Sequence, residues 1–192
     1  FKTGLYSSPH VLDLRERIQV DGEWIPKRSF AEGMCRIAEL IDKANPSLRP
    51  TFFEILTALA FAHFSRARVD WAVVETGLGG RLDATNVLKP DLTVLTRIGL
   101  DHQDLLGNTV AKIAGEKAGI LKAGVPCVSA AQVPAAARVI RARARALNAP
   151  LHALLPPLLG EAGSGGNQFD IRLAMPGAHQ RQNAALAMAG LA

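Results

Sequence analysis

The sequence predicts an α/β fold: a mostly parallel, doubly wound sheet with helices on both faces. Helix and strand patterns alternate along its 192 residues, which is typical of βαβ units. The two clearest strand segments, Trp71–Glu75 and Leu92–Leu95, are almost entirely apolar, as parallel strands covered on both faces are. Glycines and charged residues follow several strands, and ligands bind at the carboxyl ends of strands in such sheets. We expect one domain spanning residues 1–192.

The first third of the chain predicts a short strand and two helices. Gly4–Ser7 is the strand, and Ser29–Ala44 has amphipathic helical spacing with a serine N-cap at its start. A second helix is predicted over Thr51–Ser65, where Thr51 and Glu54 have the spacing of a capping box. This helix is apolar nearly all round, so we expect it to be buried.

The remaining elements continue the same alternation. Thr109–Leu121 predicts a helix that stops near Gly124, Val125–Val128 a strand, and Pro134–Leu147 a helix with proline in its first turn. Beyond them the sequence predicts a Pro/Gly-rich loop, a half-exposed strand and a last helix, at Leu155–Asn167, Gln168–Leu173 and from about Ala178.

The composition is that of an ordinary globular protein, with 48% hydrophobic and 20% charged residues. The net charge of +5 suits an anionic small substrate and nucleic acid about equally well. The arginine-rich face of the helix at 134–147 lacks aromatic residues for base stacking, so we interpret it as a solvated face and expect no nucleic-acid partner. No apolar run approaches the length of a membrane span, and two cysteines are too few for a disulfide scaffold, so we expect a cytoplasmic protein with no membrane partner.

The strongest chemical signal is the run Glu75–Asn86, which begins at a strand end. A carboxylate at the end of a buried strand is costly unless a cation compensates it. Gly77, Gly79 and Gly80 then allow the backbone to approach a ligand closely. The alternative interpretation is an ordinary glycine turn followed by a solvated Arg/Asp pair, and the residues alone leave both open.

Two further strand ends carry polar residues, Ser8 in the first and His102 in the third. If the strands are parallel, Ser8, Glu75 and His102 should gather at one edge of the sheet, as an oxygen-rich ligand set that suits Mg²⁺ or Mn²⁺ better than Zn²⁺. His102 could equally be an ordinary surface histidine. Lys117, on a predicted helix, is by its residue context a solvated charge.

Taken in order along the chain, these motifs resemble the folylpolyglutamate synthase/dihydrofolate synthase family of the Mur ligase superfamily. The resemblance covers essentially the whole chain, and several ordered blocks make it more specific than any single glycine motif. The blocks that carry it are Tyr6–His10 with Glu16–Val20, Thr51–Ala58, Glu75–Asn86, Ile98–His102 with Leu106–Gly107, Glu116–Ile120 and Pro176–Ala185.

The resemblance implies a P-loop ATPase domain that joins L-glutamate to dihydropteroate or folate through an acyl phosphate. It implies that Ser8 and Glu75 hold one Mg²⁺ and His102 a second, with a catalytic role for His102 and for Lys117 as a carbamylated lysine. Asn183 is expected to contact ATP. The residues expected to bind the pteroate part are Thr51, Phe52, Phe53, Glu54, Leu82, Asp83 and Ala84. We expect a monomer whose partners are these small molecules.

The sequence departs from the family pattern at both ends. The phosphate-binding glycine loop is expected just before Phe1, and a carboxy-terminal domain after Ala192, so we expect the chain alone to be inactive. Thr76 and Arg97 stand where valine and serine are common, and both changes look tolerable. The alternatives are another Mur-superfamily amino-acid ligase, such as a peptidoglycan-precursor or cyanophycin ligase, and a nucleotide-binding module without catalysis.

Overall fold

The chain divides into two units, which are described here one at a time. In this computed structural model the described residues are 1–45, 47–154, 173–174 and 176–191. The first unit spans Phe1–Leu88 and the second Lys89–Ala192. The predicted loop at 155–167, and all of the predicted strand at 168–173 except Leu173, lie outside the described residues.

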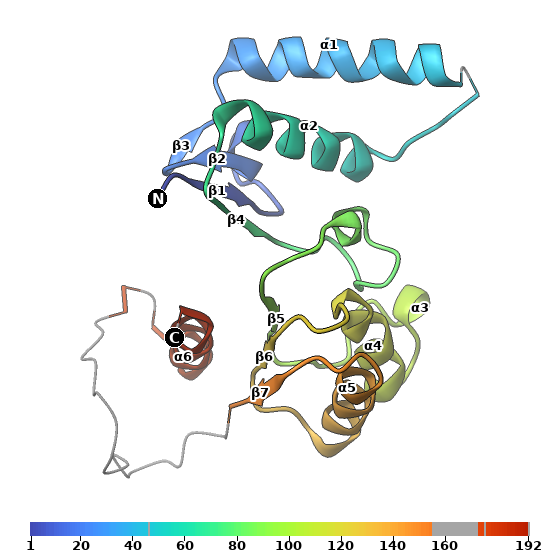
Figure 1. Cartoon of the computed structure of the whole chain (residues 1–192), viewed down its shortest axis with the longest axis vertical. Helices are drawn as coiled ribbons and strands as arrows, with labels where there is room; N and C mark the ends of the chain where they lie inside the picture. The colour runs from blue at the N-terminus through green and yellow to red at the C-terminus, as the bar shows by residue number, and fades with distance from the viewer. Residues whose placement is uncertain (46, 155–172, 175, 192) are drawn as a thin grey trace. The chain divides into compact units, whose positions relative to one another are not determined.

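The first unit contains a mixed four-stranded sheet with the order β3-β2-β1-β4. Strand β1 (Thr3–Tyr6) pairs parallel with β4 (Trp71–Val74) and antiparallel with β2 (Ile18–Val20), and β2 pairs antiparallel with β3 (Glu23–Trp24) (Figure 1). The prediction of a mostly parallel sheet is therefore wrong for this unit. The two strands that make it mixed are too short to give a period-2 pattern in the sequence.

Two helices complete the first unit. Helix α2 (Phe52–Ala67) has the predicted capping box, in which the Thr51 side chain accepts from the Glu54 N–H and the Glu54 carboxylate accepts from the Thr51 N–H. Helix α1 (Lys27–Ala44) begins two residues earlier than predicted, with Pro26 as N-cap and no side-chain cap. The prediction of a serine cap at Ser29 is therefore wrong, because Ser29 lies inside the first turn of the helix, after Lys27 and Arg28.

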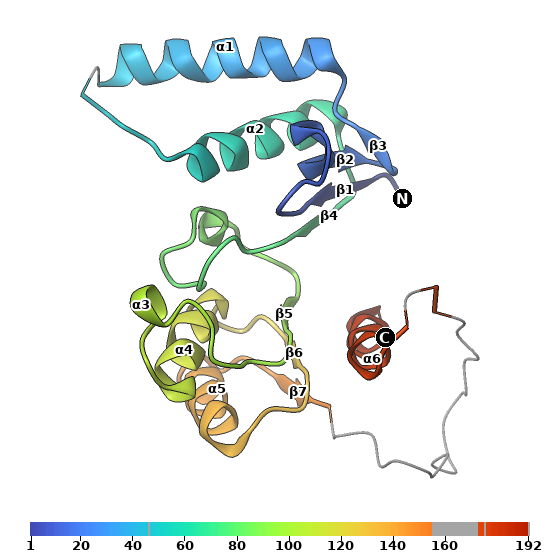
Figure 2. The same ribbon diagram turned by 180° about the vertical axis from the view of Figure 1, so that it is seen from behind.

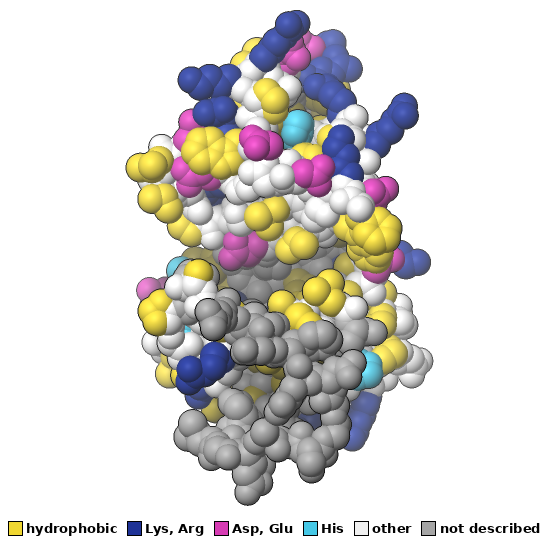
Figure 3. Space-filling model, turned by 90° about the vertical axis from the view of Figure 1, so that its left-hand side faces the viewer, with side chains coloured by type: hydrophobic (Ala, Val, Ile, Leu, Met, Phe, Trp, Pro, Cys, Tyr) yellow, Lys and Arg dark blue, Asp and Glu magenta, His cyan; other side chains and the backbone are white. Residues whose placement is uncertain are grey.

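Helix α2 covers one face of the first sheet. The core between them is built from one tyrosine, one phenylalanine and aliphatic residues, namely Tyr6, Ile18, Ile25, Leu56, Leu59, Ala60 and Phe64. On the other face Trp71 and Val73 are 52% and 60% exposed, and β4 lies at the edge of the sheet. The prediction that this strand is covered on both faces is not met by the described residues. Figure 3 shows hydrophobic side chains exposed among charged ones on one face of the molecule.

The second unit contains a parallel sheet with helices on both faces, as predicted. Strands β5 (Thr93–Leu95), β6 (Cys127–Ser129) and β7 (Leu151–Ala153) lie in that order. Helices α4 (Val110–Lys117) and α5 (Pro134–Ala146) pack on one side of the sheet through the larger apolar core. Helix α6 (Ala178–Leu191) packs on the other side, where Leu186 meets Val128 and Ala130 (Figures 1 and 2).

Short elements connect these pieces. They are the 3₁₀ turns η1 (Leu14–Arg17), η2 (Ala84–Val87) and η3 (Ala118–Ile120) and the one-turn helix α3 (Gln103–Leu106). Helix α4 thus ends at Lys117 and continues as η3, whereas the sequence predicted one helix to Leu121. Within the described ranges, no helix combines the length and apolar character needed to cross a membrane.

Candidate functional site

Ser8 and Glu75 lie together at the carboxyl ends of two parallel strands. The register of β1 and β4 sets Tyr6 opposite Val74, and the Glu75 N–H continues the ladder by donating to the Tyr6 carbonyl at 2.9 Å. The Ser8 N–H then donates to Glu75 Oε2 at 2.7 Å. The structure therefore brings together two of the three residues that were predicted to meet at one edge of a single sheet, whereas His102 follows β5, a strand of the other sheet.

The chemistry of this pair suits a hard divalent cation. Glu75 is exposed, and its second oxygen, Oε1, has no hydrogen-bond partner in the described part of the chain. Ser8, whose backbone N–H contacts this carboxylate, is half-buried and carries a hydroxyl. Carboxylate and hydroxyl oxygens are ligands that Mg²⁺ prefers. No group of three or more His, Cys, Asp and Glu side chains comes together among the described residues.

The segment that follows Ser8 is organised by a single carboxylate. Glu16 accepts hydrogen bonds from the backbone N–H groups of Val11, Leu12 and Asp13 at 2.8–2.9 Å. The bonds from Val11 and Asp13 are the main cause that lowers the pKa of Glu16 below its ordinary value. Sequence reasoning did not identify this role, although Asp13 and Glu16 have capping-box spacing, and the structure shows that capping box.

Asp83 plays the corresponding part in the glycine-rich loop. Its Oδ2 accepts from the Leu78 N–H at 2.9 Å, and its Oδ1 accepts from the Thr85 N–H and hydroxyl at 2.9 and 2.6 Å. The carboxylate therefore closes the loop and caps η2. This finding corrects the interpretation of Asp83 as half of a solvated Arg/Asp pair. It also leaves Asp83 few lone pairs for a substrate, to which the resemblance assigned it.

The amino end of α2 contacts this loop. The Phe53 ring lies against Gly77, where a Cβ would come within 2.5 Å of the ring. The centroids of the Phe53 and Tyr6 rings are 5.7 Å apart. Phe52 is 55% exposed, with the Arg17 guanidinium 5.7 Å from its ring. The predicted pteroate segments, 51–54 and 82–84, thus belong to contacting elements of the first unit, α2 and η2.

Behind these residues lies a buried polar pair that sequence reasoning missed. The Thr57 hydroxyl donates to the Phe53 carbonyl at 2.8 Å, so the Tyr6 hydroxyl, 3.1 Å away, must donate to Thr57. Burial is the main cause that raises the pKa of the Tyr6 phenol above its ordinary value. The pair fixes the end of β1, two residues before Ser8, to the first turns of α2.

His102 lies in the second unit, in an unusual backbone conformation. It precedes α3 with φ 47°, in the left-handed region that non-glycine residues seldom adopt. Its N–H donates to Asp101 Oδ1 at 2.8 Å, and its Nε2 is 3.7 Å from Asp101 Oδ2. The side chain is 58% exposed. An exposed imidazole on a backbone held in this region is consistent with a functional role.

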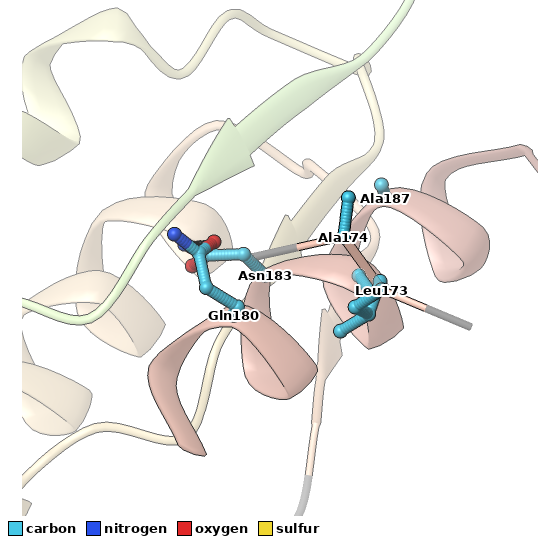
Figure 4. Close-up of a pocket in the computed structure, with 6 residues that line it drawn as sticks. Leu173, Ala174, Gln180, Asn183 and Ala187 are labelled. Carbon is cyan, nitrogen blue, oxygen red and sulfur yellow. Dashed lines mark hydrogen bonds between the residues drawn. The ribbon is translucent and has the colours of Figure 1, made fainter. Parts of the chain in front are cut away.

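Lys117 and Asn183 lie on other elements of the second unit. Lys117 is the last residue of α4 and is half-buried, and its ammonium group has no partner among the described side chains. Asn183 lies on α6 beside a cavity of about 310 Å³, where its amide donates to Gln180 Oε1 at 3.5 Å. Figure 4 shows these two polar side chains at one end of the cavity and Leu173, Ala174 and Ala187 at the other.

The structure thus brings together the part of the predicted site that lies in the first unit. Ser8, Glu75 and the two pteroate segments belong to that unit, and His102, Lys117 and Asn183 to the second. The predicted gathering of Ser8, Glu75 and His102 around divalent cations stays a prediction.

Comparisons with known proteins point to one family of ligases. No family model matches the chain. It is 42% identical over 208 residues to dihydrofolate synthase/folylpolyglutamate synthase of Bacillus subtilis, covering 98% of this chain and 47% of that protein. It matches the structure of Mycobacterium tuberculosis folylpolyglutamate synthase complexed with ADP and AMPPCP with a TM-score of 0.86 and 37% identity, over 99% of this chain and 48% of that one.

A third match is to a solved complex with a named small molecule. An FPGS–AMPPCP–folate complex matches with a TM-score of 0.76 and 39% identity, covering 79% of this chain and 38% of that chain. The chain therefore spans about half the length of the Bacillus relative and less of this structure.

Proposed function

We propose, because this chain is a homologue of the folylpolyglutamate synthases and dihydrofolate synthases, that it forms part of an ATP-dependent ligase for L-glutamate. The acceptor that we propose is the carboxylate of dihydropteroate, of a folate, or of both. One homologous structure contains folate together with AMPPCP, which supports this substrate class.

The observation that carries the proposal is the contact between Ser8 and Glu75. A parallel strand pair delivers a hydroxyl and a carboxylate to one sheet edge, and one carboxylate oxygen is left available. The same edge is followed by the glycine-rich loop, which α2 contacts through Phe53. Oxygen ligands suit the metal ions that assist phosphoryl transfer, and apolar side chains suit an aromatic acceptor, so both features support this class of reaction.

The proposed reaction has two steps. The acceptor carboxylate oxygen attacks the γ-phosphorus of ATP, the bond to the bridging oxygen breaks, and ADP and an acyl phosphate form. The amine nitrogen of glutamate then attacks the acyl carbon, the carbon–oxygen bond to phosphate breaks, and the amide forms with loss of a proton from nitrogen. When bound, Mg²⁺ neutralises the charge of the phosphate oxygens.

The residues of this chain take the following proposed roles. Ser8 and Glu75 hold one Mg²⁺, and His102 holds a second. Lys117 has no partner among the described residues, which leaves its amine available for carbamylation. Exposed Phe52 and Leu82 offer apolar surface to the pteroate rings, while Asp83 and Glu54 shape the segments that carry them. Asn183 contacts the nucleotide.

The test uses the full-length protein that contains this chain. It is incubated with ATP, Mg²⁺ and L-glutamate, first with dihydropteroate and then with a folate monoglutamate, and products are identified by mass spectrometry. We expect acceptor-dependent ADP release and a product one glutamyl residue heavier. ADP release with a peptidoglycan precursor and with neither pterin acceptor would contradict the proposal.

A further inference from the structure

Gln132, just before α5, makes three hydrogen bonds at the carboxyl ends of β5 and β6. Its Oε1 accepts from the Ile98 N–H at 2.9 Å, and its Nε2 donates to the Thr96 carbonyl at 2.8 Å and to Ser129 Oγ at 3.2 Å. A side-chain amide has the same donor and acceptor as a peptide group. The Gln132 side chain therefore makes the hydrogen bonds to the backbone after β5 that a further residue of a neighbouring strand would make.

The backbone beyond β5 has no strand partner for these groups. The β5–β6 pairing ends where the Ala130 N–H donates to the Leu95 carbonyl at 2.8 Å. Ile98 is only 3% exposed and packs in the larger core, so an unpaired N–H there would be costly. The amide of Gln132 satisfies this group. The orientation of the Gln132 amide is fixed, because in the flipped amide Nε2 would face the Ile98 N–H, donor against donor.

The loop that follows has an anchored stem and an exposed tip. Residues 96–98 form the stem, which is held by Gln132 and by the buried side chain of Ile98. Residues 99–102 form the tip: a Cβ built on Gly99 would meet nothing within 4 Å, and His102 at its end is exposed. The stem holds the tip at one end, and at the other end the His102 carbonyl accepts from the Leu105 and Leu106 N–H groups of α3, so the position of the tip depends on both.

We propose that Gln132 is a positioning residue for His102. By fixing the backbone of residues 96–98, its amide sets where the imidazole lies, without touching substrate itself. The inference rests on the proposed function in one respect, since the role of His102 as a metal ligand comes from there. Its local part, that Gln132 orders this loop, does not depend on the reaction.

The local part is tested by hydrogen exchange in the full-length protein. Gln132→Leu is expected to lower the protection of the Ile98 amide at least about tenfold, the order of one net hydrogen bond. The matched control is Gln19→Leu, which removes an equivalent bond, Gln19 Nε2 to the Glu16 carbonyl at 2.8 Å, in the first unit. The control should leave Ile98 protection unchanged. Equal protection of Ile98 in wild type and Gln132→Leu overturns the inference.

The functional part is tested by a double-mutant cycle. Gln132→Leu is expected to lower kcat about tenfold with KM for ATP and glutamate within about twofold, and to weaken Mn²⁺ binding measured by electron paramagnetic resonance. In a His102→Ala background the same change should lower kcat less than about twofold, because it acts through His102. An equal effect in both backgrounds overturns the inference, as does a wild-type kcat despite lost Ile98 protection.

The variant Gln132→Glu separates the two hydrogen bonds. Glutamate keeps an acceptor for the Ile98 N–H but sets a carboxylate against the Thr96 carbonyl, so its kcat should fall between wild type and Gln132→Leu. A kcat below that of Gln132→Leu counts against the inference. If the wild-type protein ligates no glutamate, the proposed function fails, whereas exchange at Ile98 and Mn²⁺ binding still decide on Gln132.

Discussion

The two carboxylate oxygens of Glu75 differ in their hydrogen bonding. Oε2 accepts the Ser8 N–H at 2.7 Å and so ties the segment after β1 to the end of β4. Oε1 has no hydrogen-bond partner within the described ranges. Structure and proposed chemistry therefore use separate atoms of one side chain, and a substitution can remove the charge while keeping the bond.

Glu75→Gln is that substitution. The amide oxygen can still accept the Ser8 N–H, so the free energy of unfolding should change by less than about 1 kcal/mol. Loss of the negative charge should weaken metal binding at least about tenfold. Metal affinity is measured by Mn²⁺ titration and the free energy of unfolding by urea unfolding, both on the full-length protein. Glu23→Gln, an exposed glutamate on β3, is the control, and equal Mn²⁺ affinity of Glu75→Gln and wild type would rule out Glu75 as a ligand.

A pH dependence follows from Glu16. Backbone hydrogen bonds from Val11 and Asp13 lower the pKa of this carboxyl, so the native state favours its charged form. Its contribution to stability is therefore complete above the ordinary glutamate pKa of about 4.3 and is lost as the pH falls through the lower folded value. Wild type should exceed Glu16→Gln in unfolding free energy at pH 6 to 8, and the difference should shrink below about pH 4. A difference that is constant down to pH 3 would contradict this.

At the scale of elements, the glycine-rich loop and α2 are matched in shape. Gly77 has no positive φ, so it is not needed for its backbone conformation. It is needed because the Phe53 ring occupies the space where a side chain would lie. The Phe53 ring in turn packs against the Tyr6 ring, whose hydroxyl is hydrogen-bonded to Thr57. The proposed acceptor surface therefore depends on packing between α2 and the loop.

Gly77→Ala tests this packing. The added methyl group would meet the Phe53 ring, and we expect destabilisation of about 1–3 kcal/mol in urea unfolding. Phe53→Leu in the same chain should recover part of the loss, as a coupling of about 0.5 kcal/mol or more. Gly115→Ala is the matched control: nothing lies near its Cβ position, and on α4 alanine should stabilise by about 0.5–1 kcal/mol. Wild-type stability of Gly77→Ala would refute the argument.

Local signals allowed part of this to be predicted from sequence. The capping box of α2 and the proline start of α5 depend on neighbouring residues, and both are found. The Ser8–Glu75 contact followed from parallel strand ends. Asp83 had a readable signal, since an aspartate two residues before threonine often forms a local turn. Gln132 had none, because its partners Ile98 and Thr96 are 34 and 36 residues away.

At the scale of the whole molecule, each of the two units contains one cysteine, so thiol reactivity can report on each unit separately. Cys35 is exposed on α1 of the first unit, and Cys127 is fully buried on β6 of the second. Burial raises the pKa of the Cys127 thiol to about 11. Both effects act against its reaction, since the thiolate is the nucleophile and the reagent cannot reach the sulfur.

Thiol labelling of the 192-residue chain at pH 8 should therefore proceed in two phases. Cys35 should react with an aromatic disulfide reagent at the rate of an exposed thiol. Cys127 should react only when the second unit opens, because a pKa of about 11 leaves about one thiolate in a thousand at that pH, and the reagent cannot reach the buried sulfur. Urea should accelerate the slow phase in parallel with loss of the β6 core. Cys35→Ser should remove the fast phase alone, and two fast thiols in the native chain would mean that β6 is not the centre of a packed sheet.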